Sequence, residues 1–424
     1  MNRKIYVATA ILVIIAAALG WYYFVYTKTP EYSLKMIGEA VNTHDVNKFK
    51  KHVDLDSVVS RAVDDFADYS LKKLKEDSNG NELSNALVDG LGRGLFMAVK
   101  PEINNSLKKK IISAVETGEW KSESVKNSSR EPKEAEGITE STALKTAKYG
   151  GVKYVEKRDA VAAVGVDVIV PGLDEPFTIV LKMRKLEDGM WQISEIENFM
   201  DYVKVIAELR KKELNEYISK VKKIQYDNDV KFTKYRKEHP RDVDPVKEKE
   251  IKIALQAIEL EKYSQLLELP VPDGAKELGQ LIKDSAHLHQ ELYGCYEPGT
   301  SRVKDDPKTQ IRHWELKKKI EENNSACNKF LKKDKNRLIN KGQDLLIGTW
   351  KDEKGATLEI GANKFGLTVY DVSDVVETEE NTIVQISITR GRSSAEMIFP
   401  KDNRDMMTLV NPITDYTMKY TRVK

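Results

Sequence analysis

Residues 164–183 read VGVDVIVPGLDEPFTIVLKM and contain the clearest fold signal of the chain. The alternating apolar residues are Val164, Val166, Val168 and Val170 in the first half and Phe177, Ile179, Leu181 and Met183 in the second. A period of two is typical of a strand with one buried face, and Pro171-Gly172 is a turn signal between the two runs. The pattern predicts an antiparallel hairpin, continued by a strand around Trp191 and Ile193.

The residues before this hairpin repeat their apolar side chains every three or four positions, which is typical of amphipathic helices. One such stripe consists of Ile103, Leu107, Ile111 and Val115. Helices followed by a curled antiparallel sheet predict an α+β domain over residues 29–200. Residues 121–147 are polar and lack periodicity, so we expect a mobile loop there.

The second half of the chain changes character twice. Residues 201–343 are rich in Lys and Glu with a narrow apolar stripe, and Pro240 and Pro245 interrupt them, which predicts a charged helical bundle or hairpin. Residues 344–424 hold short strands separated by turn residues, which predicts an antiparallel β-meander forming a half-barrel or small barrel. The expected fold class is therefore multidomain α+β.

The N-terminal residues 5–26, IYVATAILVIIAAALGWYYFVY, are uncharged. A helix of this length spans about 33 Å, enough for a ~30 Å hydrocarbon core, so residues 1–28 are predicted to be a transmembrane anchor. The basic residues before it predict a cytosolic N-terminus, with the rest of the chain outside a plasma (inner) membrane. The residues expected at the membrane interface are Arg3, Lys4, Trp21, Tyr22, Tyr23 and Tyr26. The alternative is a cleaved signal peptide with a site near residues 16–18.

The charge balance excludes two classes of protein. The chain has 424 residues, with 69 Lys+Arg against 67 Asp+Glu and a net charge of +2. A general nucleic-acid binder normally carries a large basic excess, so we expect no nucleic-acid partner. An intrinsically disordered chain combines high net charge with few apolar residues, whereas 40% of this chain is hydrophobic.

The chain has two cysteines, Cys295 and Cys327. In an extracytoplasmic compartment such a pair is often a disulfide, and we expect a bridge that staples two helices. It would close a loop of about 33 residues, which chain entropy values at roughly 3–4 kcal/mol. The alternative is two free thiols, and a pair of thiols is only half of a zinc site.

No stretch of the sequence predicts a catalytic, metal or cofactor site. His44-Asp45 is interpreted as an exposed turn in which Asp45 caps the next helix. His287 and Glu291, four residues apart, indicate a surface ion pair. The phosphate-loop, zinc-protease and serine-hydrolase motifs are missing from the sequence, so we expect no cofactor.

Residues 302–341 carry 13 Lys+Arg and 6 Asp+Glu. A helix with this excess could bind an anionic lipid or an anionic envelope polymer. The alternative interpretation is a solvated helix face, because basic runs are common on surfaces.

Three parts of the chain resemble known families. The segment Thr29-Pro30-Glu31-Tyr32-Ser33-Leu34, with His44-Asp45, Phe49 and Val53-Asp54 after it, resembles the uncharacterised bacterial membrane-anchored domain-of-unknown-function family 2939 over residues 5–115. The helix-then-sheet order ending at Trp191 is similar to the nuclear-transport-factor-2-like cone, a fold of isomerases and of non-catalytic binding modules. The segments 346–350 and 420–422 are similar to the ends of small lipocalin-like β-domains. The first resemblance implies a membrane helix and no particular activity.

These observations predict a single-pass, membrane-anchored extracytoplasmic protein without enzymatic activity. It would bind a protein partner or a small apolar ligand at the cell envelope. The alternative is a hydrolase or isomerase that uses the concave face of the α+β domain.

Overall fold

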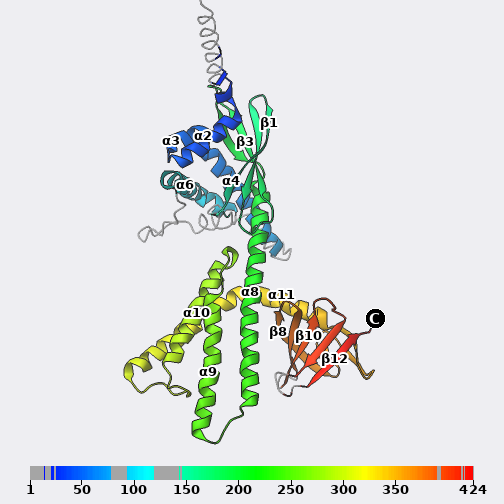
Figure 1. Ribbon diagram of the computed structural model, residues 1–424. Coiled ribbons are helices and arrows are strands. Elements are labelled where there is room, and N and C mark those ends of the chain that lie inside the picture. The colour runs from blue at the N-terminus through cyan, green and yellow to red at the C-terminus, as the bar shows by residue number, and fades with distance from the viewer. Residues whose placement is uncertain are drawn as a thin grey trace, which may run out of the picture. The chain divides into compact units, whose positions relative to one another are not determined.

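The computed structural model describes residues 14, 21–22, 25–77, 93–118, 143, 146–388, 393–411, 414 and 416–423 (Figure 1). The chain divides into two compact units, Met1–Leu209 and Arg210–Lys424, which are described separately. The architecture is mixed α+β, as the sequence predicted.

Unit 1 begins with short helices and continues into a sheet. The helices are η1 (Tyr26–Lys28), α2 (Pro30–Asn42), α3 (Val46–His52), α4 (Leu55–Asp77) and α6 (Arg93–Thr117). Thr29 caps α2 by accepting a hydrogen bond from the backbone N–H of Tyr32, and Pro30 occupies the first helical position, where its missing N–H costs little.

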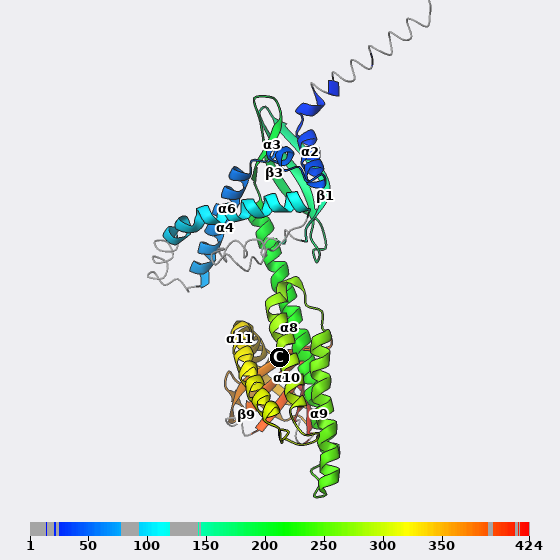
Figure 2. The same ribbon diagram turned by 90° about the vertical axis from the view of Figure 1, so that its left-hand side faces the viewer.

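The sheet is a four-stranded antiparallel meander. Its strands follow chain order: β1 (Lys148–Arg158), β2 (Val161–Ile169), β3 (Phe177–Lys185) and β4 (Trp191–Ile196). Val164 pairs with Leu181 and Val166 with Ile179, so the predicted hairpin is confirmed. Ala162, Val164 and Val166 of β2 are buried with Met183 and Trp191 against the helices, and Figure 2 shows α6 lying across the sheet.

The Val53-Asp54 pair joins the helices of unit 1 to the sheet. Val53 forms an isolated parallel bridge with Ile193, and the Asp54 N–H donates to the Ile193 carbonyl at 2.9 Å. The Asp54 carboxylate accepts from the Ser57 N–H at 3.1 Å and from Arg184 at 2.8 Å. The predicted cap by Asp45 is also present, since it accepts from the Lys48 N–H at 2.9 Å.

Unit 2 is built from long helices and a β-barrel. Its helices are α8 (Phe199–Glu238, which begins in unit 1), α9 (Pro245–Glu268), η3 (Asp273–Ala275), α10 (Lys276–Gly294) and α11 (Pro307–Leu346). The chain breaks between α8 and α9 at Pro240 and Pro245, where the sequence placed an interruption. The apolar stripes of α8, α9 and α10 meet in one core around Tyr217, Leu266 and Leu278.

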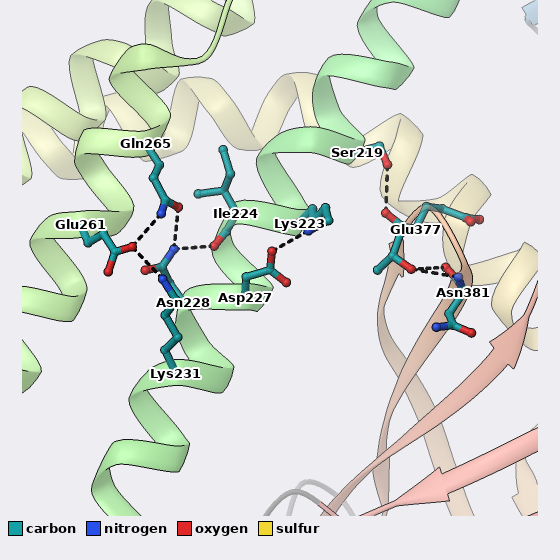
Figure 3. A network of polar contacts seen from close by, with 11 residues as sticks. Ser219, Lys223, Ile224, Asp227, Asn228, Lys231, Glu261, Gln265, Glu377 and Asn381 are labelled. Carbon is teal, nitrogen blue, oxygen red and sulfur yellow. Dashed lines mark hydrogen bonds and ion pairs between the residues drawn. The ribbon is translucent and has the colours of Figure 1, made fainter.

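A polar layer fixes the register of α8 against α9 (Figure 3). The side chain of Asn228 is buried, and its amide nitrogen donates to Gln265 at 3.0 Å and to the Ile224 carbonyl at 2.9 Å. Glu261 accepts from Gln265 at 2.9 Å and from Lys231 at 2.7 Å. Buried polar groups need such partners, so this layer specifies one pairing of the two helices.

The C-terminal strands close into a barrel. In the described residues the strands are β5 (Gly348–Asp352), β6 (Thr357–Ile360), β7 (Lys364–Phe365), β8 (Thr368–Glu377), β9 (Asn381–Ile388), β10 (Ser393–Pro400), β11 (Met406–Val410) and β12 (Thr417–Arg422). Each pairs with its neighbour in the chain, and β12 pairs with β5 to complete the circle. The predicted meander is thus a closed eight-stranded barrel, compatible with the lipocalin-like expectation.

Side chains fill the interior of this barrel. Trp350 and Met397 are completely buried, and Tyr370 and Phe399 are nearly so. Trp350 also donates from its indole nitrogen to the Leu346 carbonyl at 2.8 Å and so plugs the barrel beside the end of α11. The interior is therefore a packed core.

Arg422 ties the barrel to the end of α11. Its guanidinium lies 4.3 Å from the centre of the Trp350 ring and donates to the carbonyls of Leu345 and Ile347, each at 2.7 Å. These are terminal carbonyls that the helix itself leaves without partners. One side chain from β12 thus caps α11 and covers the barrel plug.

Several sequence predictions fall on residues outside those described. None of the described helices combines the length and hydropathy that a membrane crossing requires. Most of the predicted span 5–26, including Tyr23, lies outside the described residues, as do Arg3 and Lys4 and most of the predicted loop 121–147. Of the predicted interface aromatics, Trp21 and Tyr22 both pack against Tyr26, with ring centroids 6.1 and 5.5 Å apart.

Replacing Arg422 with alanine should lower the free energy of unfolding by about 2–4 kcal/mol, because two helix-terminal carbonyls lose charged donors and Trp350 loses its cover. Urea unfolding of the full chain measures the change. Lys419→Ala is the matched control, since Lys419 is exposed on the same strand. Equal unfolding curves for the two variants would contradict the clamp.

Candidate functional site: an aromatic cleft in the helices of unit 2

Cys295 and Cys327 are both free thiols, so the predicted disulfide is not formed in this fold. The register of α10 and α11 explains why. Asn323 on α11 donates to the Leu281 carbonyl at 2.8 Å, and Arg312 pairs with Glu291, so the two helices run antiparallel.

This register separates the two thiols. Cys295 immediately precedes Tyr296, whose hydroxyl is 3.1 Å from the Nε2 of His313. His313 and Cys327 are fourteen positions apart on α11, about 21 Å at 1.5 Å per residue. A disulfide requires Cα atoms within about 7 Å, so the bridge cannot form without unpacking the helices.

Unit 1 has two places where an enzyme site could lie: the helix-covered face of its sheet and a hollow beside that face. The helix-covered face of the unit 1 sheet is a packed apolar core around Met183 and Trp191. A 490 Å³ hollow beside it is lined by Asp54, but that carboxylate already caps α4 and pairs with Arg184. Burial works to raise the pKa of Asp54, while hydrogen bonds from Ser57 and the charge of Arg184 outweigh it and lower the pKa. Asp54 is thus a structural carboxylate.

The helices of unit 2 enclose a cleft of about 570 Å³, here named the aromatic cleft. Residues from α8, α9, α10, α11 and the loop 296–303 line it. Its rings are Phe232, His289, Tyr293, Tyr296 and His313. Its aliphatic residues are Leu255, Leu292 and Val303, and its cations are Lys252 and Lys317.

The rings form a continuous chain of contacts that also includes Tyr263. His289 stacks on Tyr263 with centroids 4.8 Å apart and planes 16° apart. Tyr263 contacts Tyr293 at 6.3 Å, Tyr293 contacts Tyr296 at 6.4 Å, and Tyr296 meets His313 edge-on at 5.3 Å. All five are only partly buried. Tyr263 packs against the helical core, whereas the other four rings line the cleft and present aromatic surface to it.

Hydrogen bonds orient the two imidazoles. The Nδ1 of His289 donates to the Ser285 carbonyl at 2.8 Å. Burial and the nearby charge of Lys317 lower the pKa of His313, which favours its neutral form. The Nε2 of His313 lies 3.1 Å from the Tyr296 hydroxyl, and in the tautomer in which this hydroxyl donates, Nδ1 carries the proton.

The charges around the cleft favour an anion. Lys317 makes no ion pair with any residue that the structure describes, and Lys252 is 3.7 Å from Glu248. The one acid in the lining, Glu259, pairs with Lys262 at 2.5 Å. Lys317, which belongs to the predicted basic stretch 302–341, lies in the lining of the aromatic cleft.

The loop 296–303 depends on Gly299 and Gln256. Gly299 has φ +71°, and a Cβ there would lie 2.6 Å from the Lys249 carbonyl oxygen. Gln256 accepts from the Gly299 N–H at 3.1 Å and donates to the Thr300 carbonyl at 3.3 Å. Glycine is required because the loop backbone lies directly on α9.

A second cavity of about 530 Å³ also reaches His289, and it contains Cys327. Burial raises the pKa of this thiol, which keeps it protonated and a poor nucleophile. Burial, together with Cys327, also raises the pKa of Tyr217. Among the described residues, no group of three or more His, Cys, Asp or Glu is arranged to hold a metal ion.

The sequence predicted a basic stretch over residues 302–341, which contains Lys317, but it did not predict the rings of the cleft. Tyr293 and Tyr296, three positions apart at the end of α10, were the available signal. The predicted pair of His287 with Glu291 is not formed, because Glu291 pairs with Arg312 across the helix interface.

Unfolding the chain in denaturant without reductant should expose two titratable thiols, because the helix register keeps Cys295 and Cys327 apart. Thiol titration with and without prior reduction measures this. No titratable thiol before reduction and two after it would contradict the register.

Gly299→Ala should lower the free energy of unfolding by about 1–3 kcal/mol, since the added methyl meets backbone and the positive φ disfavours alanine. Thermal unfolding measures the change. Gly294→Ala, with open space at its Cβ, is the control and should leave stability unchanged or slightly higher. Equal losses in both variants would remove the argument for loop anchoring.

Comparison of the chain with protein-family models, with curated proteins and with solved structures finds no match.

Proposed function

We propose that this protein is a single-pass, membrane-anchored extracytoplasmic protein that binds a ligand without transforming it, and that the aromatic cleft is its binding site. The partly buried ring chain beside Lys317 is the observation that carries this proposal. Aromatic and aliphatic walls with a few polar groups are typical of small-molecule sites, and the volume falls within their usual ~300–1,000 Å³.

Binding fits the cleft better than catalysis does. An enzyme would need a nucleophile or acid–base pair with matched pKa values. The carboxylate and the two imidazoles of the lining already have partners: Glu259 pairs with Lys262, His289 donates to the Ser285 carbonyl, and His313 bonds Tyr296. The alternative is an enzyme that uses the concave face of the unit 1 sheet. The helix-covered face of this sheet is filled by a packed apolar core.

The membrane part of the proposal rests on the sequence. The uncharged run 5–26 has the length of a bilayer span, and Arg3 and Lys4 precede it. The resemblance of residues 5–115 to a membrane-anchored family supports the same topology. In this arrangement residues 29–424 lie outside the cytosol.

Placing two lysines in the apolar run, Leu12→Lys with Ile15→Lys, should release the chain from membranes, because each buried charge costs about 2.5–3.5 kcal/mol at mid-bilayer. Fractionation after carbonate extraction measures retention. The control is Lys318→Gln, which should remain membrane-bound. Protease added to spheroplasts, in which the outer face of the plasma (inner) membrane is accessible, should digest the wild-type chain beyond residue 28. Full protection of the units, or a wild-type chain in the carbonate supernatant, would contradict the proposal.

A further inference from the structure

We infer that the ligand of the aromatic cleft is a small amphiphile, with an apolar body and a single anionic headgroup that is a carboxylate or a phosphate ester. This inference rests on the proposed binding function of the cleft and names its ligand class. Three properties of the cleft lead to it: its apolar walls, its unpaired cation and its hydrogen-bond donor beside that cation.

The walls select an apolar body. Phe232, Leu255, Leu292 and Val303 contribute apolar side chains from three helices and the loop 296–303. Tyr293 and Tyr296 add ring faces that remain partly exposed. Burying hydrocarbon against these surfaces is favourable at about 25 cal/mol per Å². A chain of roughly eight carbons fits the scale of a 570 Å³ cleft.

The charges select an anionic head. Lys317 is an exposed residue of the cleft lining and has no carboxylate partner among the described residues, so a ligand that enters the cleft would cover part of this side chain. Partial desolvation of an unpaired charge is unfavourable, and a headgroup of opposite charge compensates it. Lys252 reinforces this preference from α9, because its contact with Glu248 is long at 3.7 Å and half-exposed.

His313 supplies a directional contact for that head. Its Nε2 is hydrogen-bonded to the Tyr296 hydroxyl. In the tautomer in which this hydroxyl donates, the imidazole proton lies on Nδ1, and we assign this tautomer to the ligand-bound cleft. A carboxylate or phosphate group can accept one hydrogen bond from this imidazole N–H and another from a lysine ammonium group. A cationic amphiphile would instead meet Lys317 and Lys252, while Glu259 is already paired with Lys262.

The test compares three eight-carbon probes that differ only in the headgroup: octanoate, octyl phosphate and 1-octanol. The full chain is held in nanodiscs of zwitterionic lipid, and binding is measured by titration calorimetry after subtraction of empty nanodiscs. We expect both anions to bind at least about tenfold more tightly than octanol. The tighter of the two anions assigns the headgroup as carboxylate or phosphate.

The variant Lys252→Gln with Lys317→Gln should weaken both anions about tenfold and leave octanol unchanged, because only the charges are removed. Lys318→Gln, next to Lys317 but outside the cleft lining, is the matched control and should bind all probes as the wild type does.

The possible results distinguish a wrong ligand class from a cleft that is not a binding site. Octanol that binds as tightly as the anions, or anion binding that survives the double variant, would overturn the anionic ligand class while leaving the cleft as a binding site. The absence of binding by all three probes would overturn both the amphiphile and the binding role of the cleft.

Discussion

The antiparallel register of α10 and α11 is the constraint on which the features of unit 2 depend. The Asn323–Leu281 hydrogen bond fixes it near one end, and the Arg312–Glu291 pair and the Tyr296–His313 contact fix it near the other. The same register keeps the cysteines apart and brings His313 and Lys317 against the tyrosines of α10. A shift of one helical turn would remove the cation from the cleft.

The two β-containing regions serve as packed supports in this account. The sheet of unit 1 buries one face under helices, and the barrel of unit 2 fills its interior around Trp350. Arg422 then couples the closed barrel to the last carbonyls of α11. The proposed binding surface lies instead among the helices, where side chains of intermediate burial line the aromatic cleft.

Features that depend on neighbouring residues could be predicted from the sequence, whereas contacts between distant segments could not. The period of two around Val164 and the cap by Asp45 each depend on neighbouring residues, and the structure contains both. The bridge between Cys295 and Cys327 depended on how two distant helices align, which periodicity does not encode. The cleft could not be predicted for the same reason, because its rings come from separate helices and a loop.

Mapping of a photoreactive ligand on the full chain in membranes tests the central claim most directly. The probe is octanoic acid with a diazirine at the end of its chain, and cross-linked peptides are identified by mass spectrometry. The account predicts labels on residues 252–259 and 292–303, suppressed by excess octanoate. Labels confined to the barrel strands or to residues 5–26, with none on the helices of unit 2, would contradict it.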